Sequence, residues 1–350
     1  MSHTAACPSF GKREADDLLV WLGPPFFSAH LEQSGWRIVR ADHSLPILRN
    51  WDDILALADG VPPKVLVVAD GSQPPAVIGM ERFPCITVFY SVDSHIHSWH
   101  SLYGQAFDLC LISLRDQLSS FYRKRLPKER IRWSPPHARD EFRPGDTPPD
   151  KEWDLIFAGT VNPEFAPKRC AFLDEVKKAF PGLHITGVSF PLVYPKARLI
   201  LNECTYGELN FRVFEALGCG GCLLTPDIGP SVTELFADGK ELFLYPPYNV
   251  PTLLERVHTL LADARLRQQA TLAGLAAVDA RHRASHRAQA LDELLRPLLA
   301  SGEAGEIIRQ RLSASTAIHR EILRFIYLLH AESMDVPALR EAYLAAYRGA

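Results

Sequence analysis

The sequence predicts an α/β protein with two successive domains, each built around a parallel β-sheet. Short apolar runs alternate with helical patterns, as expected for parallel strands joined by crossover helices. The alternation occurs on both sides of the stretch RPGDTPPDKE at 143–152, whose proline and charge content is typical of a linker. A chain of 350 residues is long enough for two such domains. We expect them to face each other across a ligand cleft.

The first half of the chain contains six apolar runs that we expect to form strands. These runs occupy residues 17–23, 36–40, 64–69, 86–90, 107–112 and 131–133. The segment 51–58 has a helical pattern, 24–35 fits a short helix or a loop, and 1–17 reads as a loose polar start. The first domain is therefore predicted to span 1–147.

The second half repeats this organisation without a recognisable sequence repeat. Expected strands lie at 153–159, 183–186, 199–202, 222–224 and 241–245, and helical patterns at 168–180, 211–218 and 250–277. The second domain is predicted to span 148–300, followed by a helical extension at 301–350. Part of this extension is expected to return to the first domain, and the remainder could form a homo-oligomer interface.

The composition excludes several classes of protein. The net charge of −3 argues against a dedicated nucleic-acid or membrane-surface binder. No apolar run approaches the roughly 20 residues that a membrane-spanning helix requires. The start MSHTAACPSFGKREADD lacks the apolar core of a signal peptide, so we predict a cytoplasmic protein. The seven scattered cysteines do not suggest a disulfide framework.

The stretch GELNFRVFEALGCGGCLLT at 207–225 carries the strongest functional signal. It predicts a turn, a short amphipathic helix with Asn210 at its N-cap, a glycine break and a buried strand. The free N–H groups at such a helix start favour a diphosphate. Arg212 in the first turn adds a positive fork, and Glu215 in the next turn could accept hydrogen bonds from a ribose diol. The alternative is an ordinary βα packing unit.

This stretch, N-F-R-V-F-E-A-L-G-C-G followed by an apolar strand and T-E-L-F-A-D-G-K-E-L, resembles the C-terminal domain of GT-B glycosyltransferases. It is most similar to the spore-maturation (CgeB-like) branch, which carries a similar N-x-R-x-F-E-A-x-x-C-G string. The likeness covers roughly residues 60–300 and is tightest over 153–245. It implies a nucleotide-sugar donor on the second domain and an acceptor on the first.

The resemblance also implies roles for individual residues. Glu215 would hold the nucleotide ribose, with Asn210, Phe211 and Arg212 also at the donor. Many relatives carry a second glutamate eight positions earlier, where this chain has Gly207 and only the adjacent Glu208. The chain therefore lacks, at this position, the carboxylate that recognises the sugar ring in those relatives.

A second basic cluster follows the first strand of the second half. The run Phe157-Ala-Gly-Thr160 with Lys168 and Arg169 resembles the family's F-x-G-x strand end and its nearby basic residues. Thr160 would contact a phosphate or sugar, and Lys168 or Arg169 would neutralise the diphosphate. The alternative is a solvated basic pair at the start of a helix.

Polar residues also follow the fourth expected strand, where ligands of open α/β sheets are usually found. Asp93 and His95 are the candidates there, and the resemblance places them near the acceptor as catalytic residues. A metal site at His95, His97 and His100 is an alternative, since H-x-H can chelate. No other ligand cluster has a recognisable spacing, so no metal is predicted.

The pair Cys219 and Cys222 forms a C-x-x-C motif. A redox motif normally lies at a helix N-terminus, where the dipole lowers the thiol pKa, but this pair follows a helix. One pair also cannot complete a four-ligand zinc site. We expect these cysteines to pack at a tight turn.

Together these features predict a metal-independent glycosyltransferase that moves a hexose from a nucleotide sugar to an unknown acceptor. No resident cofactor is expected. The resemblance suggests transfer with retention of anomeric configuration, and the absence of a recognisable nucleophile–base pair agrees with a front-face path. The alternatives are a binding or assembly protein that kept the fold without the chemistry, and a nucleotide-sugar epimerase.

Overall fold

The computed structural model describes residues 17–41, 47–123, 125–145 and 149–349. The chain divides into two compact units. Unit 1 contains Met1–Tyr90, Leu102–Cys110 and Leu291–Ala350, and unit 2 contains Ser91–Ser101 and Leu111–Ala290. The expected domain boundary between 147 and 148 lies outside the described residues, as do residues 1–16 of the expected polar start.

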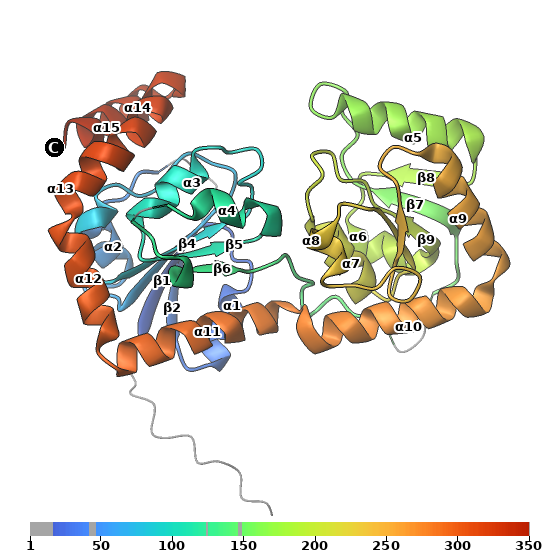
Figure 1. The fold of residues 1–350 in the computed structure, drawn as a ribbon, viewed down its shortest axis with the longest axis horizontal. Coiled ribbons are helices and arrows are strands. Elements are labelled where there is room, and N and C mark those ends of the chain that lie inside the picture. Colours follow the sequence, from blue (N-terminus) through green and yellow to red (C-terminus); the bar gives the residue numbers. More distant parts are fainter. Residues whose placement is uncertain (1–16, 42–46, 124, 146–148, 350) are drawn as a thin grey trace, which may run out of the picture. The chain divides into compact units, whose positions relative to one another are not determined.

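The first sheet has six strands in the order β2-β1-β3-β4-β5-β6 (Figure 1). The strands are β1 (Leu18–Leu22), β2 (Arg37–Ala41), β3 (Val65–Ala69), β4 (Ile86–Ser91), β5 (Leu109–Ile112) and β6 (Ile131–Trp133). β1 pairs in parallel with β2 and β3, and β3 pairs in parallel with β4. β1, β3, β4 and β5 are buried along their whole length, because a parallel sheet is covered on both faces.

Helices from both ends of the described chain belong to unit 1. Its helices are α1 (Ser28–Gln33), α2 (Trp51–Leu57), α12 (Glu303–Ser313), α13 (Ser315–Ile318), α14 (Arg324–Ser333) and α15 (Pro337–Arg348), with a π-helical turn η6 (His319–Leu323) before α14. Helix α11 (Ala284–Ala300) enters this unit, where Asp292 accepts a hydrogen bond of 2.6 Å from the Trp36 indole. The C-terminal helices therefore pack in the unit that holds most of the first sheet, as expected for part of the tail.

The second sheet has five strands in the order β11-β10-β9-β7-β8. The strands are β7 (Trp153–Ala158), β8 (Leu183–Thr186), β9 (Ala197–Leu201), β10 (Leu223–Pro226) and β11 (Phe243–Tyr245), and the four pairs are parallel. Read from β8, with β7 counted as the first strand, the order is 2-1-3-4-5. The first sheet has the same order over its first five strands. The strand order reverses beside β7, so that β7 and β9 flank the topological switch point.

The remaining helices belong wholly or in part to unit 2. They are α3 (His100–Tyr103), which begins in unit 2, α4 (Leu118–Phe121), α5 (Pro167–Ala179), α6 (Phe190–Val193), α7 (Phe211–Gly218), α8 (Pro230–Thr233), α9 (Val250–Ala262) and α10 (Ala264–Arg281). The segment 250–277, expected as one helix, is interrupted. The carboxylate of Asp263 accepts a hydrogen bond of 2.8 Å from the Leu266 amide and so caps a new helix.

None of the helices in the described part of the chain is long and apolar enough to cross a membrane.

Candidate functional site

The candidate site lies in unit 2, at the switch point of the second sheet. Ligands of open α/β sheets bind at the carboxyl ends of the strands, where the strand order reverses. Here Gly159 and Thr160 follow β7, and Asn202 and Glu203 follow β9. Phe157, near the end of β7, is buried and supports the basic side chains described below.

A buried ion pair joins α5 to the end of β9. The Arg169 guanidinium donates from Nε to Glu203 Oε2 at 2.5 Å, and Nη1 donates to the carbonyl of Thr160 at 3.2 Å. The two side chains are only 12% and 2% exposed, respectively. Glu203 also accepts hydrogen bonds from the hydroxyls of Thr205 and Tyr248, both at 3.0 Å.

Tyr248 reaches Glu203 from a strained backbone. Its φ of 60° lies in the left-handed region, which costs a non-glycine residue about 1–3 kcal/mol. The ring packs edge-on against Phe172 at a centroid distance of 5.7 Å, which helps to retain this conformation. Burial, followed by the neighbouring Glu203 carboxylate, raises the pKa of Tyr248 to about 12, so its hydroxyl remains a donor at neutral pH.

Asn210 occupies the N-cap of α7 as expected, but its side chain does not cap the helix. It exchanges hydrogen bonds with buried Asn202, accepting at 3.2 Å and donating at 3.3 Å, and also donates to the Glu203 carbonyl at 3.3 Å. No side-chain oxygen of Asn210 therefore occupies the first-turn N–H groups of α7, which stay suited to an anion.

Arg212 and Arg169 both contact the ring of Phe157. The guanidinium carbons of Arg212 and Arg169 lie 5.5 Å and 5.8 Å from the centroid of the Phe157 ring. Arg212 also donates to Asn202 at 3.4 Å. A Cβ at Gly159 would lie 3.0 Å from Arg212 Nη2, so the glycine leaves room for this guanidinium.

Glu215 is half-buried one turn further along α7. Burial raises the pKa of its carboxyl to about 7, although the Arg212 and Arg139 guanidinium groups pull the pKa in the opposite direction. Glu215 can therefore exist in either protonation state near neutral pH. Its carboxylate form would be an acceptor for two hydroxyl donors.

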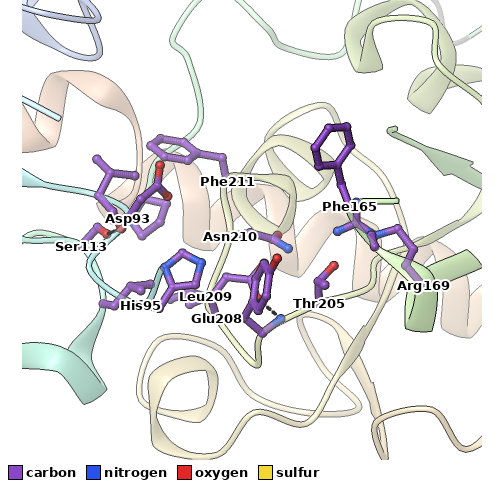
Figure 2. Close-up of a pocket in the computed structure, with 15 residues that line it drawn as sticks. Asp93, His95, Ser113, Phe165, Arg169, Thr205, Glu208, Leu209, Asn210 and Phe211 are labelled. Carbon is purple, nitrogen blue, oxygen red and sulfur yellow. Dashed lines mark hydrogen bonds between the residues drawn. The ribbon is translucent and has the colours of Figure 1, made fainter. Parts of the chain in front are cut away.

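A pocket of about 280 Å³ lies in front of these elements, and all of its lining residues belong to unit 2 (Figure 2). Asp93, His95, Ser113 and Leu114 line it together with the α5 region and the loop between β9 and α7. The lining residues from these two segments are Phe165, Ala166, Arg169, Thr205, Tyr206, Glu208, Leu209, Asn210 and Phe211. Figure 2 shows Asp93 and His95 on one side of the pocket and Phe165 and Arg169 on the other.

The structure thus brings together five of the expected site residues: Asp93, His95, Arg169, Asn210 and Phe211. The remaining four, Thr160, Lys168, Arg212 and Glu215, are not among the residues that line this pocket. Thr160 and Lys168 are exposed, and of the two basic residues in the first turn of α5 it is Arg169 that pairs with Glu203.

Asp93 and His95 lie in a short turn after β4. The Asp93 carbonyl accepts the Ile96 and His97 amides at 3.1 Å and 3.0 Å. The His95 ring lies 5.6 Å from that of Tyr206, and its buried Nδ1 has no hydrogen-bond partner among the described residues. Among these residues no group of three His, Cys, Asp or Glu side chains is placed to hold a metal ion.

Sequence reasoning missed several residues of the site. Glu203 and Tyr248 have no motif around them, and they lie 45 residues apart in the sequence. Phe165 and Tyr206 line the pocket although 75% and 62% of their surfaces are exposed. Glu208 also lines the pocket, and its carboxylate accepts the Tyr206 amide at 2.9 Å.

Cys219 and Cys222 are buried free thiols after α7. Burial raises the pKa of each to about 12, so both remain protonated and unreactive at neutral pH.

Comparison with known proteins places this geometry in context. Residues 166–293 match the family model described as glycosyl transferase-like. No curated protein sequence matches the chain significantly. Among solved structures, sucrose-phosphate synthase from Thermosynechococcus elongatus matches with a TM-score of 0.61 and 11% identity over 82% of this chain and 100% of that one.

Two further structures give similar values. A glycosyltransferase from Rickettsia africae has a TM-score of 0.57 at 8% identity, over 81% of this chain and 98% of that one. HepE from Anabaena, in complex with UDP and glucose, has a TM-score of 0.56 at 10% identity, over 81% and 100%. At such identities the likeness concerns the fold. The chain has the α/β fold of GT-B glycosyltransferases, with two parallel sheets.

Proposed function

We propose that this protein is a glycosyltransferase that uses a nucleotide-sugar donor. The observation that carries the proposal is the pocket at the switch point of the second sheet, where Arg169 and the start of α7 meet Asp93 and His95. The glycosyl transferase-like match over 166–293 includes α5 and α7, and one structure of similar fold contains UDP and glucose.

The donor diphosphate would bind beside α7. The helix start offers backbone N–H groups and a positive dipole end, and Arg169 and Arg212 add positive charge. These groups would stabilise the departing nucleoside diphosphate without a metal ion, because charge that develops on a leaving group is stabilised by preorganised donors. Thr160 and Lys168 would serve at the outer edge of this anion site.

The donor ribose would bind Glu215. Its carboxylate would accept hydrogen bonds from both ribose hydroxyls, and Asn210 and Phe211 would complete the donor site. The carboxylate of Glu208 supports contact with the sugar ring, because it lines the pocket even though the family's usual position is Gly207.

The acceptor would approach from the side of Asp93 and His95. In a retaining front-face path, the bond between the anomeric carbon and the diphosphate oxygen breaks while the acceptor oxygen bonds to the same face of the sugar. The acceptor proton passes to the leaving diphosphate oxygen. Asp93 and His95 would hold the acceptor hydroxyl in line for this step, and the protein would need no nucleophile of its own.

The finer assignments belong to the same proposal. We assign the chain to the CgeB-like branch, with a hexose as the transferred sugar, no resident cofactor and a cytoplasmic location. The expected domain limits, 1–147, 148–300 and 301–350, and a homo-oligomer formed through the C-terminal helices also stand as proposals.

Calorimetric titration with UDP, GDP, ADP and dTDP tests the donor site. One of the four is expected to bind, and the matching nucleotide sugars should then be hydrolysed or transferred. Binding without turnover of any donor would favour the binding-protein alternative, and a changed sugar on the recovered nucleotide would favour an epimerase. If none of the four binds, the glycosyltransferase proposal fails.

A further inference from the structure

The buried carboxylate of Glu203 has no place in the proposed reaction, yet it lies immediately behind the pocket. It is 2% exposed and follows β9 at the switch point. An ionised carboxylate in such a position requires hydrogen-bond partners, since burial of an unpaired charge is unfavourable. Glu203 has three: Arg169, Thr205 and Tyr248.

The geometry of Arg169 shows what this carboxylate fixes. Arg169 binds Glu203 through Nε and the Thr160 carbonyl through Nη1. The same side chain lines the pocket. Arg169 is thus held on one side by Glu203 and presents its remaining donor capacity to the pocket, because a guanidinium has five N–H donors and no acceptor.

We infer that Glu203 is a positioning residue, which orients Arg169 toward the donor diphosphate. Tyr248 in turn holds Glu203, because its hydroxyl donates a hydrogen bond of 3.0 Å to the carboxylate. The backbone of Tyr248 lies in the left-handed region. This inference rests on the proposed function, because it assumes that the anion bound in the pocket is a diphosphate.

The opposite reading of the ion pair is that Glu203 neutralises Arg169 and weakens anion binding. The two interpretations predict opposite changes in nucleoside diphosphate affinity when Glu203 loses its charge. If Glu203 orients the guanidinium, Glu203→Gln should weaken nucleoside diphosphate binding by about 10-fold, toward the lower end of what one charged hydrogen bond contributes. If it neutralises the charge, the same change should tighten binding.

A double-mutant cycle tests the inference by calorimetry. The parent, Glu203→Gln, Arg169→Met and the double variant are titrated with the nucleoside diphosphate that binds the parent most tightly, and with the corresponding nucleoside. We expect Glu203→Gln to weaken diphosphate binding and leave nucleoside binding unchanged. The double variant should bind the diphosphate no more weakly than Arg169→Met, because the effect of Glu203 passes through Arg169.

Glu234→Gln is the matched control. Glu234 also pairs with an arginine in unit 2, Arg115, at 2.5 Å, but both side chains are exposed and neither lines the pocket. This control should bind as the parent does. Additive losses in the cycle, an equal loss of nucleoside binding, or tighter diphosphate binding by Glu203→Gln would each overturn the inference.

Two further arms keep the outcome decisive. If Glu203→Gln does not fold, Tyr248→Phe removes one hydrogen bond to the carboxylate, and a loss of diphosphate affinity of a few-fold without loss of nucleoside affinity is expected. If the parent binds no nucleotide, the proposed function fails, and the cycle is repeated with inorganic pyrophosphate. Pyrophosphate binding that depends jointly on Arg169 and Glu203 would support the anion site alone, and no binding would overturn it.

Discussion

Each unit contains a buried arginine–carboxylate pair that links a helix to a residue near the end of a strand. The two pairs have different surroundings. In unit 1, Arg311 of α12 lies 3.2 Å from Asp108, and the side chains are 0% and 1% exposed. Arg311 also donates to the carbonyls of Met80, Phe83 and Cys85. In unit 2, the Arg169–Glu203 pair lines a pocket on its arginine side.

The difference separates an interaction that stabilises the fold from one that is available to a ligand. The donors of Arg311 satisfy backbone carbonyls around η1 (Met80–Arg82), so this arginine fastens α12 to the first sheet. Arg169 is held by fewer protein acceptors and borders a cavity. Substitutions at the two pairs should therefore affect different measurements.

The largest effect is expected from Arg311→Met. Removal of one partner leaves Asp108 buried without its guanidinium, and breaking a buried pair in this way costs about 3–5 kcal/mol of unfolding free energy. Arg169→Met should cost clearly less, because among the described residues Arg169 hydrogen-bonds only Glu203 and the Thr160 carbonyl, and its side chain is 12% exposed. Denaturant unfolding measures both. Equal losses from the two changes would mean that the contrast between the pairs is wrong.

Glu215→Ala is the strongest test of the ligand-facing side. Hydrogen bonds that involve a charged partner contribute about 1.5–3 kcal/mol, so nucleoside diphosphate affinity should fall roughly 10- to 150-fold. Glu215→Gln should cost less, since the amide oxygen still accepts. Calorimetry on variants that circular dichroism shows to be folded gives the result. Unchanged affinity in Glu215→Ala would refute the ribose assignment.

Asp93→Asn should separate the acceptor from the donor. If Asp93 holds the acceptor hydroxyl, transfer should fall by about 10-fold or more, because a charged acceptor is replaced by a neutral one. Donor affinity should stay within about two-fold of the parent, well below the tenfold that 1.4 kcal/mol represents. Transfer rates and calorimetry on the same preparation provide both values. A parallel loss of donor binding would assign Asp93 to the donor or to the fold.

A smaller effect is expected from pH. Glu215 has a pKa of about 7 in the folded protein against a usual 4.5, so the folded state binds more protons between these values. Its contribution to stability should therefore fall as pH rises from about 4.5 to 7 and level off above this range. Nucleoside affinity should rise over the upper part of that range as the carboxylate forms.

The nucleoside is the better probe here, because it carries no titrating phosphate. Glu215→Gln serves as the control and should remove both pH dependences. A pH dependence of nucleoside affinity that persists in this variant would have to come from another group.

Cys219→Ala should have the smallest effect. The thiol is buried and protonated, so activity should remain close to that of the parent and should not respond to reducing agents. Unfolding free energy should change by no more than about 1–2 kcal/mol, as for loss of a small buried group. A redox-dependent activity that disappears in Cys219→Ala would contradict the packing role.

The sequence allowed prediction of the elements that carry the site, because periodicity and strand composition are local. The run expected as a strand at 153–159 contains β7 (Trp153–Ala158), and Asn210 is at the N-cap of α7. The direction of the Asn210 side chain could not be predicted, since it depends on Asn202 at the end of β9. Polar residues at a helix start carry no information about such competing partners.

The contacts of Glu203 with Arg169 and Tyr248 could not be predicted for the same reason. Glu203 lies 34 residues from Arg169 and 45 from Tyr248, so no motif joins them. The break at Asp263 did have a local signal, a good capping residue within 250–277. The strong helical periodicity on both sides of Asp263 outweighed it.

Unit 1 is formed by segments that are far apart in the sequence, and this has a consequence for biosynthesis. Its sheet is encoded early, but α12 and Arg311 come from Leu291–Ala350, after the whole of unit 2. A nascent chain that has emerged only as far as residue 290 contains all of unit 2, whereas Asp108 still lacks its guanidinium. Domains generally fold during synthesis in the order in which they emerge. Here we expect the later unit to fold first, and the earlier sheet to become stable only when α12 has left the ribosome.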